Sequence, residues 1–569
     1  MRLFHQSAPA IAAPTAFFLV MAAIQPSRAD DSLPNGVAAG DVTQTSAVLW
    51  AHTTALGSLQ FEWTLDPEFN TVLGTAYVNV TDALLPAKLE ISASDGLSPG
   101  QQLYYRATDA AGAEAYGQFR TPAALGVRAG MRLGVSGDWR GELSPYPSVR
   151  NVSQRDLDLW ISLGDTIYAD FPSPAVDKDQ CETLDDFRLK HNEVYSVRYK
   201  LNTLRDVRQS TAILAMIDDH EVTNDFAGGA PPTDDPRFSS FLGDFINQTD
   251  LFQSGLQAFT EYNPIRDERW TGTNDARLDG QRNLYRYRTF GSDAAVFLTD
   301  ARSFRDAELP PAENPLDPAS IHDYLTASFD PSRTLLGRPQ IEQLKLDLLS
   351  AQNAGITWKF VLVGEPIQHL GVIFASDRYE GYAAERTELL RFVADHELTN
   401  VVFVAADIHG TLINNLTYQE GPDGGNIPVS AWEISTGSVA FDAPFARTIF
   451  DFAARLGFVP SLISGIYGVL PISGQDAVGF ALANLLLDFY GYDRLGLDRS
   501  GLPVRRERGG WLAVNSFGWT EFDVDRDSQR LQVTTYAIKP YTAQQLQKHP
   551  KDVTQRKPYV ISRFTVDPQ

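Results

Sequence analysis

The sequence predicts a mixed α/β (α+β) protein, with a small all-β domain followed by a larger α/β domain. Short alternating or apolar runs, broken by turn residues, fill residues 33–121. From Met131 onward, strand-like apolar runs alternate with longer amphipathic segments. The first pattern is typical of a β-sandwich and the second of an α/β core. Acidic and histidine motifs follow several of the later runs, so the second domain also carries the candidate site.

Residues 1–29 are predicted to be a signal peptide. Arg2 gives a weakly positive start, Ala10–Ile24 is largely apolar, and Ser27-Arg28-Ala29 supplies small residues before Asp30. This segment has no adjacent arginine pair, so Sec-type export fits better than twin-arginine export. We therefore expect a periplasmic or secreted bacterial protein. The alternative is a disordered or buried N-terminal segment.

Residues 30–124 are expected to form the β-sandwich. The segment Leu97–Arg106 resembles the loop and following strand of a fibronectin type III domain, in which Trp50 and Trp63 would be core aromatics. Pro122–Gly130 would be a linker. Seven runs have the character of short strands: Gly36–Asp41, Ser46–His52, Gln60–Leu65, Ala76–Val80, Lys88–Ile91, Gln102–Ala107 and Ala115–Arg120.

Residues 128–569 are expected to form the α/β domain. Asn224–Gln281, rich in Pro, Asp, Gly and aromatics, is interpreted as a long excursion that lines the substrate cleft. Phe445–Tyr492 is apolar but interrupted by Gly and Pro, which favours helical packing or a lid over a membrane span. The predicted buried strands are Met131–Ser136, Leu157–Leu163, Ala212–Ile217, Ala294–Leu298, Lys359–Val363 and Asn400–Ala405. The predicted helical segments are Asp185–Asp206 (one helix or a pair), Pro339–Asn353 and Ala383–Glu397.

The composition limits the partners. Lys and Arg number 48 against 71 Asp and Glu, for a net charge of −23. Such an acidic surface disfavours nucleic-acid polymers and anionic membranes. It still permits a small phosphorylated substrate, because bound cations can reverse the local sign of the charge. Cys181 is the only cysteine, so the chain has no internal disulfide, and its polar surroundings favour an incidental thiol over a nucleophile.

The candidate site residues follow four of the predicted strands. The carboxyl ends of such strands are expected to meet at one rim of a sheet. Carboxylates, imidazoles and a phenol gathered there suit a two-metal hydrolase. Gly-x-Ser-x-Gly, P-loop and Cys-x-x-Cys motifs are absent from the sequence, which removes the commonest rival classes. The residues are Asp138 after the first strand, Asp165 and Tyr168 after the second, Asp219 and His220 after the third, and Asp407 and His409 after the fourth.

The spacing within these motifs indicates roles. Asp165 and Tyr168 lie three residues apart, so that both can reach one ion, and a tyrosinate suits Fe³⁺. Asp407 and His409 face the same side of an extended segment. Each motif also has a structural explanation, such as a helix cap, a turn or core packing, so the prediction rests on the combination.

Asp219 and His220 are adjacent and are expected to divide the work. Asp219 would bind a metal, and His220 would act at the leaving group as a general acid or a stabiliser. Asn224 is close enough to add an oxygen ligand. Arg140 is a candidate for a substrate phosphate, with a plain surface arginine as the alternative. Weaker candidates are Asp300, Glu365, Gln368 and His369, and Asp170, Asp218 and Glu221 are expected to support the site.

Taken in this order, the motifs resemble those of the calcineurin-like metallophosphoesterase superfamily and, within it, the PhoD-like family of alkaline phosphatases and phosphodiesterases. The segments that carry the resemblance include Gly36–Asp41, Ala47–Trp50, Leu184–Tyr199, Asp218–Val222, Asp300–Arg305 and Ala406–His409. The resemblance implies a four-layer αββα domain with a dinuclear centre, Fe³⁺ with Ca²⁺ or with Zn²⁺, Mn²⁺ or Mg²⁺. It also implies that Asp165 bridges the metals and that Tyr168 binds the ferric ion. Asp407, His409 and either Asp219 or Asn224 would be further ligands, and His220 would assist the leaving group.

The first motif departs from the family pattern. The PhoD pattern usually has Ser-Cys-Gln after the first strand, with the cysteine on iron, whereas this chain has Ser136-Gly137-Asp138. That sequence is closer to purple acid phosphatases and makes Asp138 the natural replacement ligand. The metal identities therefore stay open.

The resulting hypothesis is a secreted or periplasmic hydrolase of phosphomonoesters, phosphodiesters or both, in which a metal-bound hydroxide attacks phosphorus in line. The alternative is a catalytically inactive envelope binding protein built on the same fold. Bound metal distinguishes the two.

Overall fold

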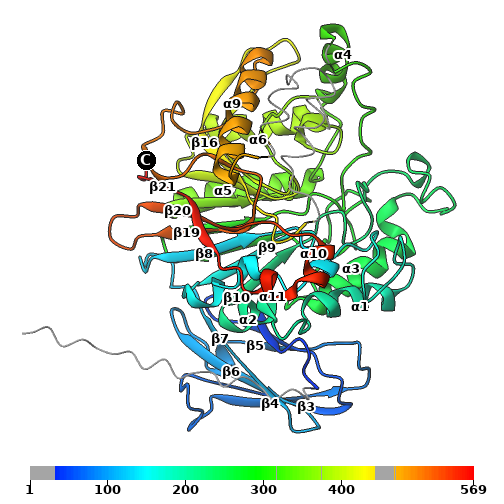
Figure 1. Ribbon diagram of the computed structural model, residues 1–569, viewed down its shortest axis with the longest axis vertical. Coiled ribbons are helices and arrows are strands. Elements are labelled where there is room, and N and C mark those ends of the chain that lie inside the picture. Colours follow the sequence, from blue (N-terminus) through cyan, green and yellow to red (C-terminus); the bar gives the residue numbers. More distant parts are fainter. Residues whose placement is uncertain (1–31, 316, 373–374, 442–466, 468) are drawn as a thin grey trace, which may run out of the picture.

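The computed structural model describes residues 32–315, 317–372, 375–441, 467 and 469–569 (Figure 1). The expected signal peptide lies outside the described residues, as does most of the first half of Phe445–Tyr492. Two large sheets and one four-stranded sheet are flanked by helices, which confirms the mixed α/β class.

The larger sheet has ten strands in the order β17-β21-β20-β19-β8-β9-β10-β1-β2-β5. Its central strands β8, β9 and β10 are parallel, so their carboxyl ends lie at the same edge. The strands are β17 (Val504–Arg508), β21 (Tyr559–Val566), β20 (Leu531–Ile538), β19 (Phe517–Val524), β8 (Met131–Ser136), β9 (Leu159–Leu163), β10 (Ala212–Met216), β1 (Val37–Gly40), β2 (Ala47–Ala51) and β5 (Ala87–Ile91).

The second sheet has seven strands in the order β11-β12-β13-β14-β16-β15-β18. Strands β12, β13 and β14 are parallel and fully buried, which explains their continuous apolar sequences. The strands are β11 (Arg286–Phe290), β12 (Ala294–Leu298), β13 (Trp358–Leu362), β14 (Val401–Ala405), β16 (Ile427–Ser435), β15 (Thr411–Tyr418) and β18 (Leu512–Ala513).

All seven strands expected in the N-terminal region form, but they divide between two sheets. β4 (Gly74–Val80), β3 (Gly57–Thr64), β6 (Gln102–Thr108) and β7 (Glu114–Arg120) make the four-stranded sheet at one end of the molecule (Figure 1). β1, β2 and β5 extend the ten-stranded sheet instead, because β1 pairs in parallel with β10. The N-terminal strands are therefore joined by hydrogen bonds to the sheet that carries the candidate site.

The two large sheets share a core. Leu133, Ile161 and Leu214 from the first sheet pack in one cluster with Phe360 and Val404 from the second. The outer face of the second sheet packs against helices α5 (Arg338–Asn353) and α6 (Ala383–Asp395). The outer face of the first packs against α1 (Leu184–Val194), α2 (Thr203–Ser210) and α3 (Asp250–Tyr262).

Helix ends follow their local sequence. Thr183 and Asp186 form a capping box at the start of α1, Asn202 caps α2, and Thr249 caps α3. The cap of α2 divides the predicted segment Asp185–Asp206 into the pair α1 and α2. The remaining helices are α4 (Pro318–Ser328), α9 (Ile472–Tyr490), α10 (Ala543–Lys548) and α11 (Pro550–Thr554).

The described part of Phe445–Tyr492 contains α9, whose Leu487 packs with Leu412 and Leu512 beside the second sheet. Gly491 ends the helix in the left-handed conformation. Across the described ranges, we find no helix that is both long and apolar enough to span a bilayer.

Candidate metal centre

Four loops meet at the strand ends that the sequence singled out. Asp138 follows β8, Asp165 follows β9, Asp219 follows β10 and Asp407 follows β14. The first three strands belong to the ten-stranded sheet and β14 to the seven-stranded sheet. The expectation of a single rim was therefore wrong: the site spans the ends of both sheets.

Main-chain hydrogen bonds tie these loops together. The amide of Asp138 donates to the carbonyl of Gly164 (3.3 Å), and that of Trp139 donates to the carbonyl of Asp165 (3.1 Å). On the other side, the amide of Ala440 donates to the carbonyl of Asp138 (3.2 Å). The first loop is thus fixed between its neighbours.

The backbone at the site is left-handed at four of the predicted residues. The φ angles are 59° at Asp138, 50° at Asp165, 63° at Asp407 and 52° at His409. Non-glycine residues adopt this conformation at a cost, and such residues cluster where function requires a particular side-chain direction. Three of these residues, Asp138, Asp165 and His409, bring their donor atoms together, whereas the carboxylate of Asp407 groups with Glu365 and Asp377.

Two groups of donor atoms share Asp165. Donor atoms of Asp138, Asp165 and His409 lie within 4.8 Å of one another, and so do those of Asp165, Asp219 and His220. Each group has the size of a cation site, and the shared carboxylate lies where a bridging ligand would be. Tyr168 joins the first group, because its hydroxyl donates to Oδ2 of Asp165 (2.8 Å) and lies 3.3 Å from Nε2 of His409.

The donor atoms of this site are suited to binding cations. Both carboxylate oxygens of Asp138 are buried without a hydrogen-bond partner among the described residues. Burial and then the charge of Asp218 raise the pKa of Asp138 and Asp407, and burial and then Asp219 raise the pKa of Asp165. Buried, mutually repelling carboxylates cost free energy unless positive charge compensates them. Two or more cations held by these oxygens and by His409 would supply it.

Glu221 organises the turns without reaching either group. Its Oε1 accepts from the amide of Thr166 (2.6 Å) and from that residue's hydroxyl (2.6 Å). Its Oε2 accepts from the amides of Asp218 (2.8 Å) and Asp165 (3.2 Å). One buried side chain therefore connects the loop after β9 to the loop after β10.

His220 is oriented by a second carboxylate. Its Nδ1 lies 2.7 Å from Oδ1 of Asp170, which leaves Nε2 facing Asp219, 4.0 Å from Oδ2. Burial disfavours the imidazolium, but Asp219 and Asp170 outweigh burial and raise the pKa of His220 to about 9. The geometry thus offers a proton on Nε2 at the edge of the second donor group.

Asn224 follows the turn that carries Asp219 and His220. Its side chain is exposed, and its Nδ2 donates to Oδ2 of Asp225 (2.5 Å). Its main-chain amide donates to Asp170 (2.8 Å), so this residue also helps to hold the partner of His220.

Arg140 is buried, so it is not a plain surface arginine. Its guanidinium forms an ion pair with Glu142 (2.5 Å) and lies 3.4 Å from the ring centre of Phe171. Phe441, whose ring centre is 5.4 Å from the same guanidinium, stacks on His409 at 3.6 Å. The structure therefore places one cation and two aromatic rings next to the first donor group; the two phenylalanines were not predicted.

A second acidic cluster centres on Asp377, which the sequence analysis missed. Its carboxylate groups with Glu365 and Asp407, and also with Asp225 and Glu308. Asp377 follows no strand, so the strand-end signal could not find it.

Two buried arginines neutralise this cluster. Arg302 donates to both oxygens of Asp377 (2.6 and 2.8 Å) and to Asp218 (2.5 Å), and Arg305 donates to Asp377 (2.6 Å). Although burial opposes ionisation, these arginines hold the pKa of Asp377 below its usual value. The predicted motif Asp300–Arg305 therefore reaches the site through its arginines.

Three weaker candidates have other contacts. Asp300 accepts from the amides of Arg302 (3.1 Å) and Ser303 (2.9 Å) and thus stabilises its own turn. Gln368 donates to the carbonyl of Asp493 (3.0 Å), and the ring of His369 stacks on Tyr492 at 4.4 Å. The polar surroundings expected for Cys181 were wrong, because it is buried in an apolar cluster. Burial raises the pKa of its thiol to about 12, which disfavours the thiolate that a nucleophile needs.

Comparisons with known proteins show the family of the chain. The family model described as PhoD-like phosphatase matches residues 135–454, which is 320 of the 569 residues. The model described as PhoD-like phosphatase, N-terminal domain, matches residues 19–123. The chain therefore belongs to the PhoD-like phosphatase family.

One curated relative and two solved structures are similar to the chain. Alkaline phosphatase D of Bacillus subtilis (strain 168) is 25% identical over 418 residues, which cover 67% of this chain and 65% of the relative, slightly less than two thirds of its length. A structure of PhoD aligns with a TM-score of 0.65 at 18% identity, covering 94% of this chain and 90% of that one, which shows a shared fold. The purple acid phosphatase PPD1 of yellow lupin (Lupinus luteus) aligns with a TM-score of 0.46 at 10% identity, covering 94% and 73%.

Proposed function

We propose that this protein is a metal-dependent hydrolase of phosphate esters, acting on phosphomonoesters, phosphodiesters or both. The observation that carries the proposal is the sharing of Asp165 by two groups of buried donor atoms. Family membership supports the same activity. Asp138, Tyr168 and His409 would hold one cation with Asp165, and Asp219 would hold the second, with Asn224 and Asp407 as further candidates.

The chain's own residues supply orientation and a proton. When bound, the cations would polarise the phosphoryl oxygens and activate water for in-line attack on phosphorus. As the bond from phosphorus to the leaving oxygen breaks, His220 would pass its Nε2 proton to that oxygen and become neutral. Asp170 holds Nδ1 of His220, so the ring cannot turn away during this transfer. Arg140, whose guanidinium lies near the Phe441 ring that stacks on His409, is the candidate for contact with a substrate phosphate.

The proposal extends to fold detail, metals and location. We interpret the two sheets with their outer helices as a four-layer αββα domain (residues 128–569) and the N-terminal strands as a fibronectin III-like domain (residues 30–124). Asp138, in place of the family's usual cysteine, leaves iron with calcium, zinc, manganese or magnesium as the expected pairs. The apolar segment before Asp30 supports export by a Sec-type signal to the periplasm or medium.

Substitution of the shared ligand tests the activity. Asp165→Asn removes a charge from both donor groups, and His409→Ala removes the imidazole of one. We expect each variant to lose hydrolysis of an aryl phosphate and of a bis-aryl phosphate. The exposed Asp179→Asn and His549→Ala are matched controls that should keep wild-type rates. Full activity in either site variant would contradict the proposal.

Metal content separates the enzyme from an inactive binding protein. We expect elemental analysis to find two tightly held metals per chain, and a chelator to remove both the metals and the activity. A chain that binds no metal and hydrolyses none of the substrates would favour the binding protein.

A further inference from the structure

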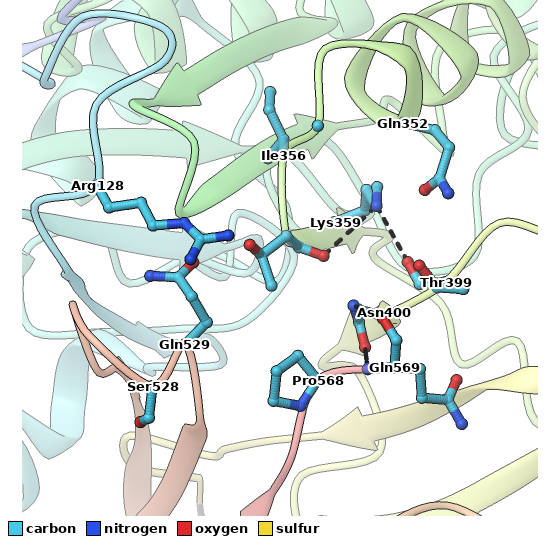
Figure 2. A pocket seen from close by; sticks show the side chains of 12 residues that line it. Arg128, Gln352, Ile356, Lys359, Thr399, Asn400, Ser528, Gln529, Pro568 and Gln569 are labelled. Atoms are coloured by element: carbon cyan, nitrogen blue, oxygen red, sulfur yellow. Dashed lines mark hydrogen bonds between the residues drawn. The ribbon is translucent and has the colours of Figure 1, made fainter.

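A polar pocket lies at the opposite end of the seven-stranded sheet from the metal centre. Figure 2 shows Lys359 in this pocket, which has a volume of about 360 Å³. Lys359 is the second residue of β13, whereas Glu365, in the acidic cluster, follows that strand's other end. The lining residues are Arg128, Gln352, Gly355, Ile356, Thr357, Lys359, Thr399, Asn400, Ser528, Gln529, Pro568 and Gln569.

The side chains that line the pocket are basic, although the protein as a whole is acidic. Arg128 and Lys359 contribute two positive charges, no acidic side chain lines the pocket, and the main-chain carboxylate of Gln569 accepts from Nδ2 of Asn400 (3.3 Å). The chain as a whole carries a net charge of −23, so the positive charge of the lining is not a consequence of the overall composition. A volume of this size is typical of sites for small ligands.

Lys359 is a buried cation without a counter-ion. Only 2% of its surface is exposed, and its ammonium donates to the carbonyls of Thr357 (3.4 Å) and Thr399 (3.2 Å). Among the described residues, no carboxylate forms an ion pair with it. Burial lowers the pKa of Lys359 to about 8, so that most of it is still charged at neutral pH. A buried, uncompensated charge costs folding free energy, which a bound anion would offset.

A buried acceptor beside the pocket also lacks a donor. Nε2 of Gln529 donates to Oδ1 of Asp293 (2.7 Å), which fixes the orientation of its amide. Its buried Oε1 then has no hydrogen-bond partner in the described chain, and neither has Oε1 of Gln352. A matching ligand therefore needs a hydroxyl as well as a negative charge.

We propose that this pocket binds a small anion that also carries a hydroxyl, with its charge between Lys359 and Arg128 and its hydroxyl toward Gln529. Partly protonated inorganic phosphate and short hydroxy acids are two sources of this chemistry. The Arg128 side chain is exposed and is drawn on the other side of the pocket from Lys359 (Figure 2), so the two cations would reach the anion from different sides.

Ligand-dependent thermal unfolding of the full chain tests the proposal. The Asp165→Asn background weakens phosphate binding at the metal centre, so that the pocket around Lys359 is measured. The probes are inorganic phosphate, malate and succinate; succinate is malate without its hydroxyl. We expect phosphate or malate to raise the unfolding temperature and succinate to do so less at equal concentration.

Substitutions in the pocket test whether the ligand binds there. Lys359→Met keeps the length of the side chain without its charge, and should weaken binding at least about tenfold, whereas the exposed Lys548→Met should not. Without ligand, Lys359→Met should unfold at the same temperature or higher, because it removes an uncompensated buried charge. If it fails to fold, Arg128→Gln replaces it and should weaken binding about threefold or more. Equal ligand shifts in the Asp165→Asn parent and in the pocket variants made from it, or no shift with any probe, would overturn the proposal.

Discussion

At the residue scale, the centre depends on side chains that bind no cation. Glu221 accepts four hydrogen bonds from two loops, and Asp170 fixes the ring of His220. These residues set the distances between ligands, so their loss would loosen the site while leaving every ligand in the chain.

Glu221→Gln tests this dependence. The new amide would direct an N–H group at the backbone N–H groups that Glu221 now satisfies. We expect the free energy of unfolding to fall by about 1–3 kcal/mol and hydrolysis to fall about tenfold or more. Urea unfolding and rates with an aryl phosphate measure the two effects. Glu182→Gln, at an exposed site, is the control. A Glu221→Gln chain with wild-type stability would show that the four bonds contribute nothing.

Asp41 gives a residue-scale prediction far from the site. It is buried against Arg286 and Arg288, with Arg266 nearby. Burial favours the neutral acid, but the arginines outweigh it and lower the pKa of Asp41 to about 2, from 3.8. Because the pKa is lower in the folded state, the stabilisation is complete above pH 4 and is lost as pH falls through 2.

The difference in stability between wild type and Asp41→Asn therefore depends on pH. It should be about 2 kcal/mol at pH 7, since one pKa unit corresponds to about 1.4 kcal/mol, and it should vanish toward pH 2. Urea unfolding at several pH values measures it, with Asp179→Asn as the control. A difference that stays constant down to pH 2 would contradict the assignment.

At the scale of elements, strand ends determine the site. The strands before the site residues could be predicted because each is an apolar run of adequate length; β8 has the predicted bounds, and β9 begins two residues later than predicted. The neighbours of these strands in the sheet could not be predicted from the sequence. The alternation in Gly36–Asp41, for example, does not indicate that β1 pairs with β10. Asp377 lies in a loop, and the local sequence does not specify that this loop passes next to the site.

Gly437 is another element-scale feature without a sequence signal. Its φ is 129°, and a Cβ there would lie 2.6 Å from Oδ2 of Asp138. The segment that follows β16 can therefore close over the loop after β8 only with glycine at this position.

Gly437→Ala should displace Asp138. We expect hydrolysis to fall at least tenfold and cation affinity to weaken, because the new methyl group and the carboxylate cannot occupy the same space. Gly421→Ala, where a Cβ meets nothing within 4 Å, should change neither. Metal titration and rates measure the outcome, and equal behaviour of the two variants would contradict the argument.

At the scale of the whole molecule, the N-terminal strands and the site share one sheet. β1 pairs with β10, whose carboxyl end leads directly to Asp219. Nε1 of Trp50 donates to the carbonyl of Glu261 (2.8 Å), and Asp41 contacts two arginines of β11. The N-terminal region is thus expected to be part of the cooperative folding unit rather than a removable module.

Removal of residues 1–123 tests whether the N-terminal region belongs to the same cooperative folding unit. The deletion would leave β10 as an unpaired edge and expose the apolar surface that β1 and β2 now cover, so we expect aggregation or an unfolding temperature lower by more than about 5 °C. Co-expression of residues 32–123 as a separate chain should restore part of the loss by completing the sheet. Light scattering and calorimetry report the two outcomes. A truncated chain that stays monodisperse and unfolds at the temperature of the full chain would show that the larger domain folds independently, and the pairing of β1 with β10 would then be a docking contact between two stable units.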